Sequence, residues 1–228
     1  MKIFLCIVVL TSTLGLACNS EKKPVNAENT NTVQGSVQGP GAVKTVTRDL
    51  AGFTKIKAEN AVTVNVTITK DFGVAVEAAE SLHGSVLTEV VDDTLVISLK
   101  DNPGKKSNIT INVLMPALTG LDVAGAATAQ AAGISSDEMD ITAVGASKVY
   151  IGGTTKNLKV KAEGASSVSA ENLKAETAEV NSAGASTILV AANKSLTAEA
   201  TGASTVIYSG APKSLKQTAK DVSTIKKQ

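Results

Sequence analysis

The sequence predicts an all-β protein built as a right-handed parallel β-solenoid (β-helix), and three observations lead to that prediction. Strand-like alternation of apolar and polar residues dominates from about residue 44, and no segment has a convincing 3.6-residue apolar period. A glycine-small-small triplet, GAA at Gly125 and GAS in the four later copies, recurs about every 19 residues. Aromatic residues make up only 2% of the chain, so Ala, Val, Ile and Leu must fill the interior, which suits thin, regular β layers.

The N-terminus has the pattern of an export signal. Lys2 precedes the apolar run "IFLCIVVL", which is too short to span a bilayer as a helix. The following "TSTLGLAC" resembles the lipobox of bacterial lipoproteins and predicts a signal peptide at 1–17 with acyl chains on Cys18. Gly15 and Ala17 also satisfy the small-x-small rule of ordinary signal peptidase, so a secreted or periplasmic soluble protein stays open as the alternative.

Residues 18–43 are predicted to be a lipid-anchored flexible tether. They are rich in Asn, Gly, Ser, Thr and Pro and offer little apolar surface to bury, which is typical of a linker that holds a domain away from a membrane. Cys6 lies within the predicted signal peptide, so the mature chain keeps at most one cysteine. We therefore expect no disulfide, cysteine-based metal site or cysteine nucleophile.

Strand patterns fill residues 44–116, which we expect to form the non-repeating first part of one domain at 44–228. The segments are "AVTVNVTITK" (61–70), "GVAVEAAE" (73–80), "DTLVISLK" (93–100) and "SNITINVLMP" (107–116). Asp92 and Asp93 fit a hairpin turn better than a catalytic carboxylate pair. The stretch "ENAVTV" (59–64) looks like a distant copy of the triplet and favours one continuous domain.

Residues 117–228 carry the repeats. Their glycines are Gly125, Gly145, Gly164, Gly184 and Gly202, with a decayed copy at Asp221, and the successive spacings are 20, 19, 20, 18 and 19 residues. Even offsets from each glycine are apolar or small, whereas odd offsets hold residues such as Lys159 and Glu179. A unit this short cannot enclose a hydrophobic core by itself. The coils must therefore stack, with equivalent positions about 4.8 Å apart. The predicted inward plugs of the second face are Leu158, Leu173, Leu196 and Leu215.

The order of these blocks resembles the bacterial head GIN domain family, a former domain of unknown function labelled an auto-transporter adhesin. The resemblance rests on "FTKIKAENAVTVNVTI", "LTEVVDDTLVISLK", "INVLMPALTGLDVAGAATA" and the GAS series ending in "YSGAPKSL". It covers about residues 44–228 and implies a β-helix-like fold in exported proteins, often lipoproteins, of Bacteroidetes-type bacteria. It carries over no catalytic or binding residue.

The repeated serines raise the question of a nucleophile. They are Ser147, Ser166, Ser186 and Ser204. The nucleophile-elbow pattern G-x-S-x-G is absent, and the one histidine, His83, lies in a different part of the chain. We expect an internal ladder in which stacked hydroxyl groups hydrogen-bond along the solenoid, with the glycines serving a sterically tight backbone.

Several other site classes are not expected. The net charge is +1 and no basic stripe is present, so we expect no nucleic-acid partner. Calcium-binding solenoid repeats place an aspartate after the glycines, where this chain has Ser or Lys, so neither a metal nor another cofactor is expected. Outward acids are single and interleaved with lysines, which leaves a carbohydrate-active enzyme as the weaker alternative.

These patterns predict a non-catalytic lipoprotein of the cell envelope that acts as an adhesin or ligand-binding module, with a structural envelope protein as the alternative. We expect anchoring in the outer membrane, on either its periplasmic or its surface side, and a glycan or protein ligand. One candidate surface is a column of outward alanines: Ala126, Ala146, Ala165, Ala185 and Ala203. Tight corner packing also explains that column. Tyr150, Tyr208 and Ile207 are expected to add adhesive surface nearby.

Overall fold

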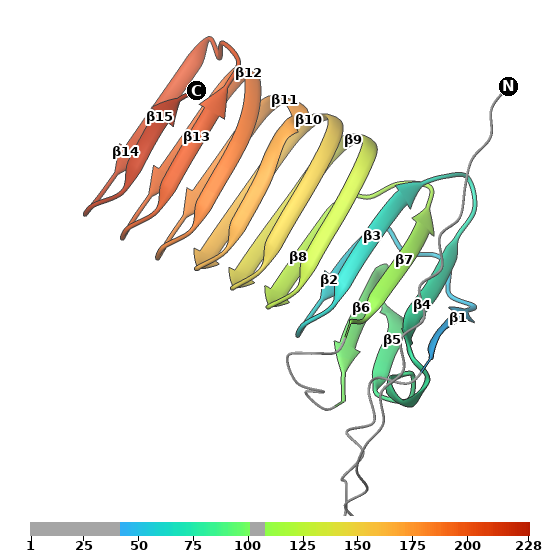
Figure 1. The fold of residues 1–228 in the computed structure, drawn as a ribbon. Coiled ribbons are helices and arrows are strands. Elements are labelled where there is room, and N and C mark those ends of the chain that lie inside the picture. Colours follow the sequence, from blue (N-terminus) through green and yellow to red (C-terminus); the bar gives the residue numbers. More distant parts are fainter. Residues whose placement is uncertain (1–41, 101–107) are drawn as a thin grey trace, which may run out of the picture. The chain divides into compact units, whose positions relative to one another are not determined.

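Strands account for nearly all of the regular structure in this protein. The computed structural model describes residues 42–100 and 108–228, so the predicted signal peptide, Cys18 and almost all of the tether at 18–43 lie outside the described residues. The fold is a β-solenoid of about five turns of roughly 20 residues (Figure 1), which confirms the predicted fold class. Within the described ranges, no helix has the length and apolar character to cross a membrane.

The elements of the described chain are fifteen strands and one turn of 3-10 helix, η1. They are β1 (Val43–Arg48), β2 (Lys55–Ala58), β3 (Thr63–Ile68), β4 (Gly73–Ala79), η1 (Glu80–Leu82), β5 (Val86–Val91), β6 (Thr94–Leu99), β7 (Thr110–Met115), β8 (Gly120–Gly125), β9 (Thr128–Gly145), β10 (Lys148–Gly164), β11 (Ser167–Ser182), β12 (Thr187–Ala200), β13 (Thr205–Ser209), β14 (Ser214–Ala219) and β15 (Thr224–Lys227).

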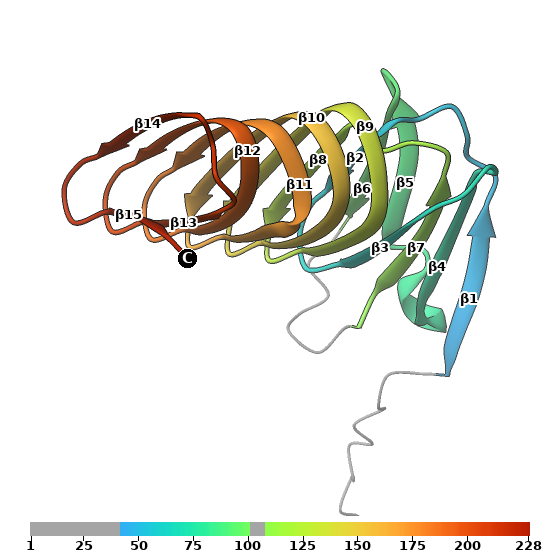
Figure 2. The same ribbon diagram turned by 90° about the horizontal axis from the view of Figure 1, so that it is seen from above.

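Two faces of the coil form two sheets, because the long strands β9 to β12 turn a corner halfway along (Figure 2). The first halves of these strands belong to the front sheet, whose order is β1-β4-β7-β3-β9-β10-β11-β12-β13-β15. The second halves belong to the back sheet, in which β5, β6, β2 and β8 precede β9 and β14 follows β12. All pairings among β8 to β15 are parallel and nearly in register.

The N-terminal strands start the solenoid. Asn60 stands where later coils have glycine: its φ is 71°, and its carbonyl accepts a 3.0 Å hydrogen bond from the amide of Ala126. The predicted distant copy at 59–64 is therefore confirmed, and residues 44–116 are not wholly non-repeating. The antiparallel pairings β1–β4 and β4–β7 were not predicted. Asp92 and Asp93 form the expected hairpin turn between β5 and β6, with φ of 47° and 59°.

The core lies between the two sheets and is made of stacked columns of small and β-branched residues. Val149, Val168 and Ile188 stack on the front sheet, and Ile141, Val160 and Val180 stack on the back sheet. All six are at most 1% exposed. The β-branched side chains favour strands and fill the layer, because each packs on its copy one coil away.

The predicted leucine plugs are only partly correct. Leu158 and Leu196 are buried in one column with Met139 and Ala178, but Leu215 in the last coil is 46% exposed. Leu173 is buried as predicted, but it does not belong to this column, because it pairs with Gly153 where β10 and β11 turn from the front sheet to the back sheet. The register shifts between Ala170 and Lys174, so a count from the preceding glycine fails beyond that bulge.

Candidate binding face

The repeat glycines build one corner of the coil. Gly125, Gly145, Gly164, Gly184 and Gly202 all have φ between 74° and 83°. A Cβ on any of the last four would lie 2.8–2.9 Å from the carbonyl oxygen of the glycine one coil before. The next residue's amide donates to that same carbonyl, as from Ala165 to Gly145 at 2.7 Å. These glycines therefore have a structural role, since a side chain would push neighbouring coils apart.

The repeat serines are buried beside that corner. Ser147, Ser166, Ser186 and Ser204 are at most 2% exposed. The hydroxyl of Ser166 donates to the carbonyl of Ala143 in the preceding coil at 3.1 Å, and Ser186 and Ser204 make equivalent bonds to Ala162 and Ser182. The predicted hydroxyl-to-hydroxyl ladder was therefore wrong in its bonding, because the acceptors one coil away are main-chain carbonyls. Buried side chains so arranged cannot reach a substrate.

His83 lies in the N-terminal part of the domain, apart from the repeat serines. It follows η1, and its Nε2 lies 3.0 Å from the carbonyl oxygen of Lys44 in β1. This contact helps to attach the first strand to the rest of the domain. Across residues 42–100 and 108–228, no group of three His, Cys, Asp or Glu side chains is arranged to hold a metal ion.

The outward surface of the front sheet, here called the front face, carries two regular columns. The hydroxyl column runs along eight adjacent strands: Thr110, Thr63, Thr128, Lys148, Ser167, Thr187, Thr205 and Thr224. The second column lies two residues further along each strand: Asn112, Asn65, Gln130, Tyr150, Ser169, Leu189, Ile207 and Lys226. Of these sixteen residues only Lys148 and Lys226 are charged.

The outward surface of the back sheet, the back face, has a different chemistry. Its columns are Lys55, Gly120, Asp140, Lys159, Glu179, Thr197, Lys216 and Lys57, Asp122, Thr142, Lys161, Asn181, Glu199, Thr218. Nine of these fourteen residues are charged, with both signs mixed. Lys161 pairs with Glu163 at 2.8 Å, and the hydrogen bond and charge of Glu59 raise the pKa of Lys57. Such a surface is typical of a solvated exterior.

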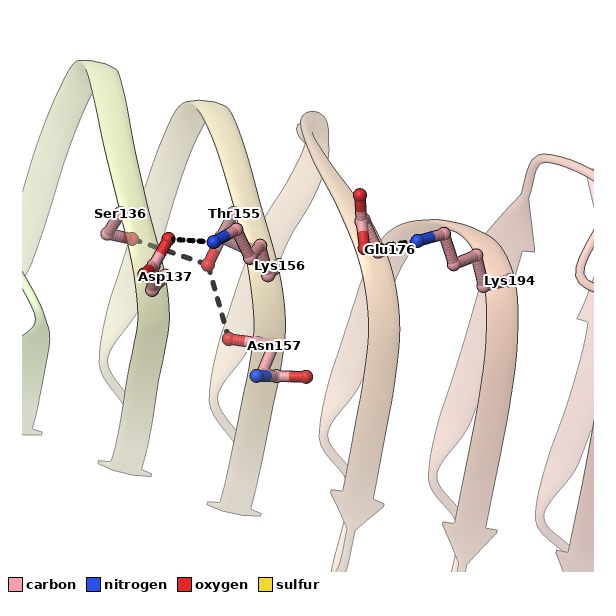
Figure 3. A network of polar contacts seen from close by, with 7 residues as sticks. All are labelled: Ser136, Asp137, Thr155, Lys156, Asn157, Glu176 and Lys194. Carbon is pink, nitrogen blue, oxygen red and sulfur yellow. Dashed lines mark hydrogen bonds and ion pairs between the residues drawn. The ribbon is translucent and has the colours of Figure 1, made fainter.

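The second corner of the coil, where β9 to β12 turn from the front sheet to the back sheet, carries a column of alternating charges (Figure 3). Lys156 lies 2.8 Å from Asp137, and Lys194 lies 2.6 Å from Glu176. The hydrogen bond and the charge of Asp137 raise the pKa of Lys156. A depression of about 550 Å³ lies here, and three of its four charged lining residues, Asp137, Lys156 and Glu176, take part in these ion pairs between neighbouring coils. These ion pairs join neighbouring coils, so this corner has a structural role, and the candidate ligand site lies on the front face.

A second depression, of about 660 Å³, lies on the front face around Tyr150, which is 46% exposed. Its polar lining consists of Asn65, Gln130, Tyr150, Ser169, Glu171 and Asn172, contributed by four strands. The amide nitrogen of Asn65 donates to the Oδ1 of Asn112 at 3.0 Å, which fixes that pair of side chains along the column. We call this the Tyr150 depression.

The sequence interpretation found only part of this surface. Tyr150 is exposed as expected, and Ile207 is half-buried on the same column. The prediction that Tyr208 adds to the outer surface was wrong. Tyr208 is only 7% exposed, because it occupies an inward column with Val190. The alanine column is exposed, but at the glycine corner. Asn65, Gln130, Glu171 and Asn172 were missed, although the fifth position after each glycine already reads Gln130, Tyr150, Ser169, Leu189 and Ile207.

Comparison with known families identifies the chain's relatives. Residues 52–212 match the family model described as "Putative auto-transporter adhesin, head GIN domain". The chain belongs to this family. The resemblance stated from the sequence blocks is thereby confirmed. No curated protein matches the chain.

Comparison with solved structures finds similar bacterial proteins. A putative adhesin from Bacteroides fragilis aligns with a TM-score of 0.64 at 21% identity, over 83% of this chain and 99% of that one. A putative lipid binding protein from Parabacteroides distasonis gives a TM-score of 0.49 at 17% identity, over 83% and 98% of the two chains. At such identities the likeness concerns the fold alone.

Proposed function

We propose that this head GIN protein is a non-catalytic adhesin of the bacterial envelope that binds its ligand through the front face. One observation carries the proposal: a flat face, in register over eight strands and nearly free of charge, lies opposite a densely charged face on the same coils. A surface held in this way is pre-organised, so little conformational entropy is lost when a ligand binds. Buried serines and an isolated histidine support a binding role over catalysis.

The same proposal includes the anchor. The sequence at 1–18 supports export and acylation of Cys18, and the polar composition of 19–41 supports a tether that carries the domain away from the outer membrane. Metabolic labelling with a palmitate analogue tests this part. Label on the wild-type chain that disappears in Cys18→Ala is the expected result, and label that persists in Cys18→Ala contradicts acylation at this residue.

The binding part is tested with beads that carry the purified chain and are applied to surfaces coated with mucin, matrix proteins or bacterial envelopes. We expect retention on at least one surface, and retention in about 0.5 M salt, because screening weakens charge pairs but not uncharged contacts. Thr187→Lys on the front face should abolish retention, whereas Thr197→Lys on the back face serves as the matched control.

Two alternative roles predict different experimental results. A structural envelope protein predicts no retention of the beads and an envelope defect when the gene is deleted. A carbohydrate-active enzyme predicts turnover of a polysaccharide that is lost with a particular carboxylate. Retention that disappears equally in Thr187→Lys and Thr197→Lys contradicts a ligand site on the front face.

A further inference from the structure

We propose that the Tyr150 depression is a subsite for one sugar ring of a neutral glycan. This inference rests on the proposed adhesive function and names the chemical class of its ligand. The depression has about 660 Å³ of space, which lies within the range of roughly 300–1,000 Å³ found for small-ligand sites.

The aromatic ring supplies the stacking surface. Tyr150 is exposed in the middle of a sheet, between Gln130 and Ser169 on the flanking strands, whereas Tyr208 is buried. The face of an aromatic ring carries partial negative charge and attracts the slightly positive C–H groups of a sugar. Next to the ring, Ala132 and Gly152 line the depression and leave room for a flat ligand.

The polar lining matches the hydroxyl groups of a sugar. Gln130, Asn172 and Ser169 can each donate and accept hydrogen bonds, as a sugar hydroxyl does. Asn65 uses its amide nitrogen in the bond to Asn112, which leaves its carbonyl oxygen available as an acceptor. The glycan can then extend from Tyr150 over Gln130 and Asn65, one strand spacing of about 4.8 Å at a time.

The charges in the depression select a neutral ligand. Glu171 is the charged residue among those that line it, and no lysine or arginine does so. A carboxylate at this place repels uronic acids, sialic acids and sulfated sugars, while it accepts hydrogen bonds from a neutral sugar. The front face is therefore suited to hexoses and N-acetylhexosamines.

A protein ligand fits this surface less well. The centres of protein interfaces are enriched in aromatic residues, Met and Arg and depleted in Ser. The two front-face columns hold one tyrosine, no Met and no Arg, and six of their sixteen residues are Thr. A hydroxyl- and amide-rich surface with a single ring is better matched to a glycan.

The experiment applies the purified chain to an array that carries neutral and acidic oligosaccharides side by side, and then measures the strongest neutral binder by calorimetry. We expect binding to neutral glycans. Tyr150→Ala should weaken it about tenfold or more, and Tyr150→Phe should retain it, because the ring and not the phenol supplies the stacking. Ala132→Leu should also weaken binding by filling the depression, while Lys161→Ala on the back face should have no effect.

Each outcome is decisive. Circular dichroism checks that every variant keeps its fold, which we expect because these side chains are exposed. Binding only to acidic glycans, or neutral binding that is unchanged in Tyr150→Ala, overturns the subsite. Retention of beads on a protein-coated surface without glycan binding also overturns it, but leaves the adhesive function standing. A chain that binds neither glycans nor any coated surface overturns both proposals.

Discussion

Gly164 sits against Gly145 so closely that a Cβ on Gly164 would lie 2.9 Å from the Gly145 carbonyl oxygen. The same contact recurs at three other coil junctions, at 2.8 to 2.9 Å. At the last junction the residue is Asp221, which has a Cβ, and there the corner hydrogen bond from Val222 to Gly202 lengthens to 3.1 Å. The glycine corner thus sets how closely the coils approach one another.

Gly164→Ala should lower the free energy of unfolding by about 1–3 kcal/mol or more, because it combines a positive φ with a steric clash. Urea denaturation measures the change. Gly133→Ala is the matched control, since its φ is 76° and no atom lies within 4 Å of an added Cβ. Equal losses in the two variants would show that φ alone, and not the contact between coils, determines the cost.

Ser166→Ala should cost about 1 kcal/mol, because it removes a buried hydrogen bond and leaves the carbonyl of Ala143 without that donor. Ser147→Ala should be neutral or stabilising, since the buried Ser147 hydroxyl has no partner in the described structure. Thermal or urea unfolding of the two variants checks this. A larger loss in Ser147→Ala than in Ser166→Ala contradicts the hydrogen-bond assignment.

Leu158→Ala should destabilise the protein by about 2–5 kcal/mol, because Leu158 is 2% exposed and its removal leaves a cavity between the sheets. Leu215→Ala, in the same column but 46% exposed, should cost much less. The midpoints of urea unfolding measure both changes. Similar losses would indicate that the last coil is covered in solution.

Lys156→Met should change how the melting temperature depends on pH at alkaline pH, but not near neutral pH. Asp137 raises the pKa of Lys156, so the pair's contribution is fully present below the ordinary lysine pKa and is lost as pH rises through the raised value. Both side chains are exposed, and the effect should be small. Melting temperatures of the two chains should run parallel from about pH 6 to about pH 9. Divergence within that range contradicts the pairing.

The sequence was sufficient to predict the solenoid, because its two determinants are local. The period-two alternation places Val149 and Val160 inward, and the glycine period brings equivalent positions together. The antiparallel pairings β1–β4 and β4–β7 were missed, because the partners of β1 and β4 depend on contacts that no repeat encodes. Leu173 was misplaced for a related reason, since the bulge at 170–174 changes the count within one coil.

The candidate site was harder to predict than the fold. Tyr150 was recognised as outward, but the depression around it needs Asn65 and Glu171, which are 106 positions apart in the sequence (171 − 65) and meet only when the coils stack. The difference between the two faces was also missed. Lys148 and Lys159 look alike as outward lysines, yet one lies on the nearly uncharged face and the other on the charged face.

The bulge at 170–174 has a consequence for how such a protein can change its length. The repeats vary from 18 to 20 residues, yet the glycine corner stays in step because the far corner takes up the difference. Each coil therefore has one corner of fixed geometry, at the glycine, and a second corner whose length can vary. Insertions at this second corner can leave the register of both sheets unchanged, but at 170–174 they would alter the Tyr150 depression, which Glu171 and Asn172 line. Duplication of a whole coil would lengthen the front face by one strand.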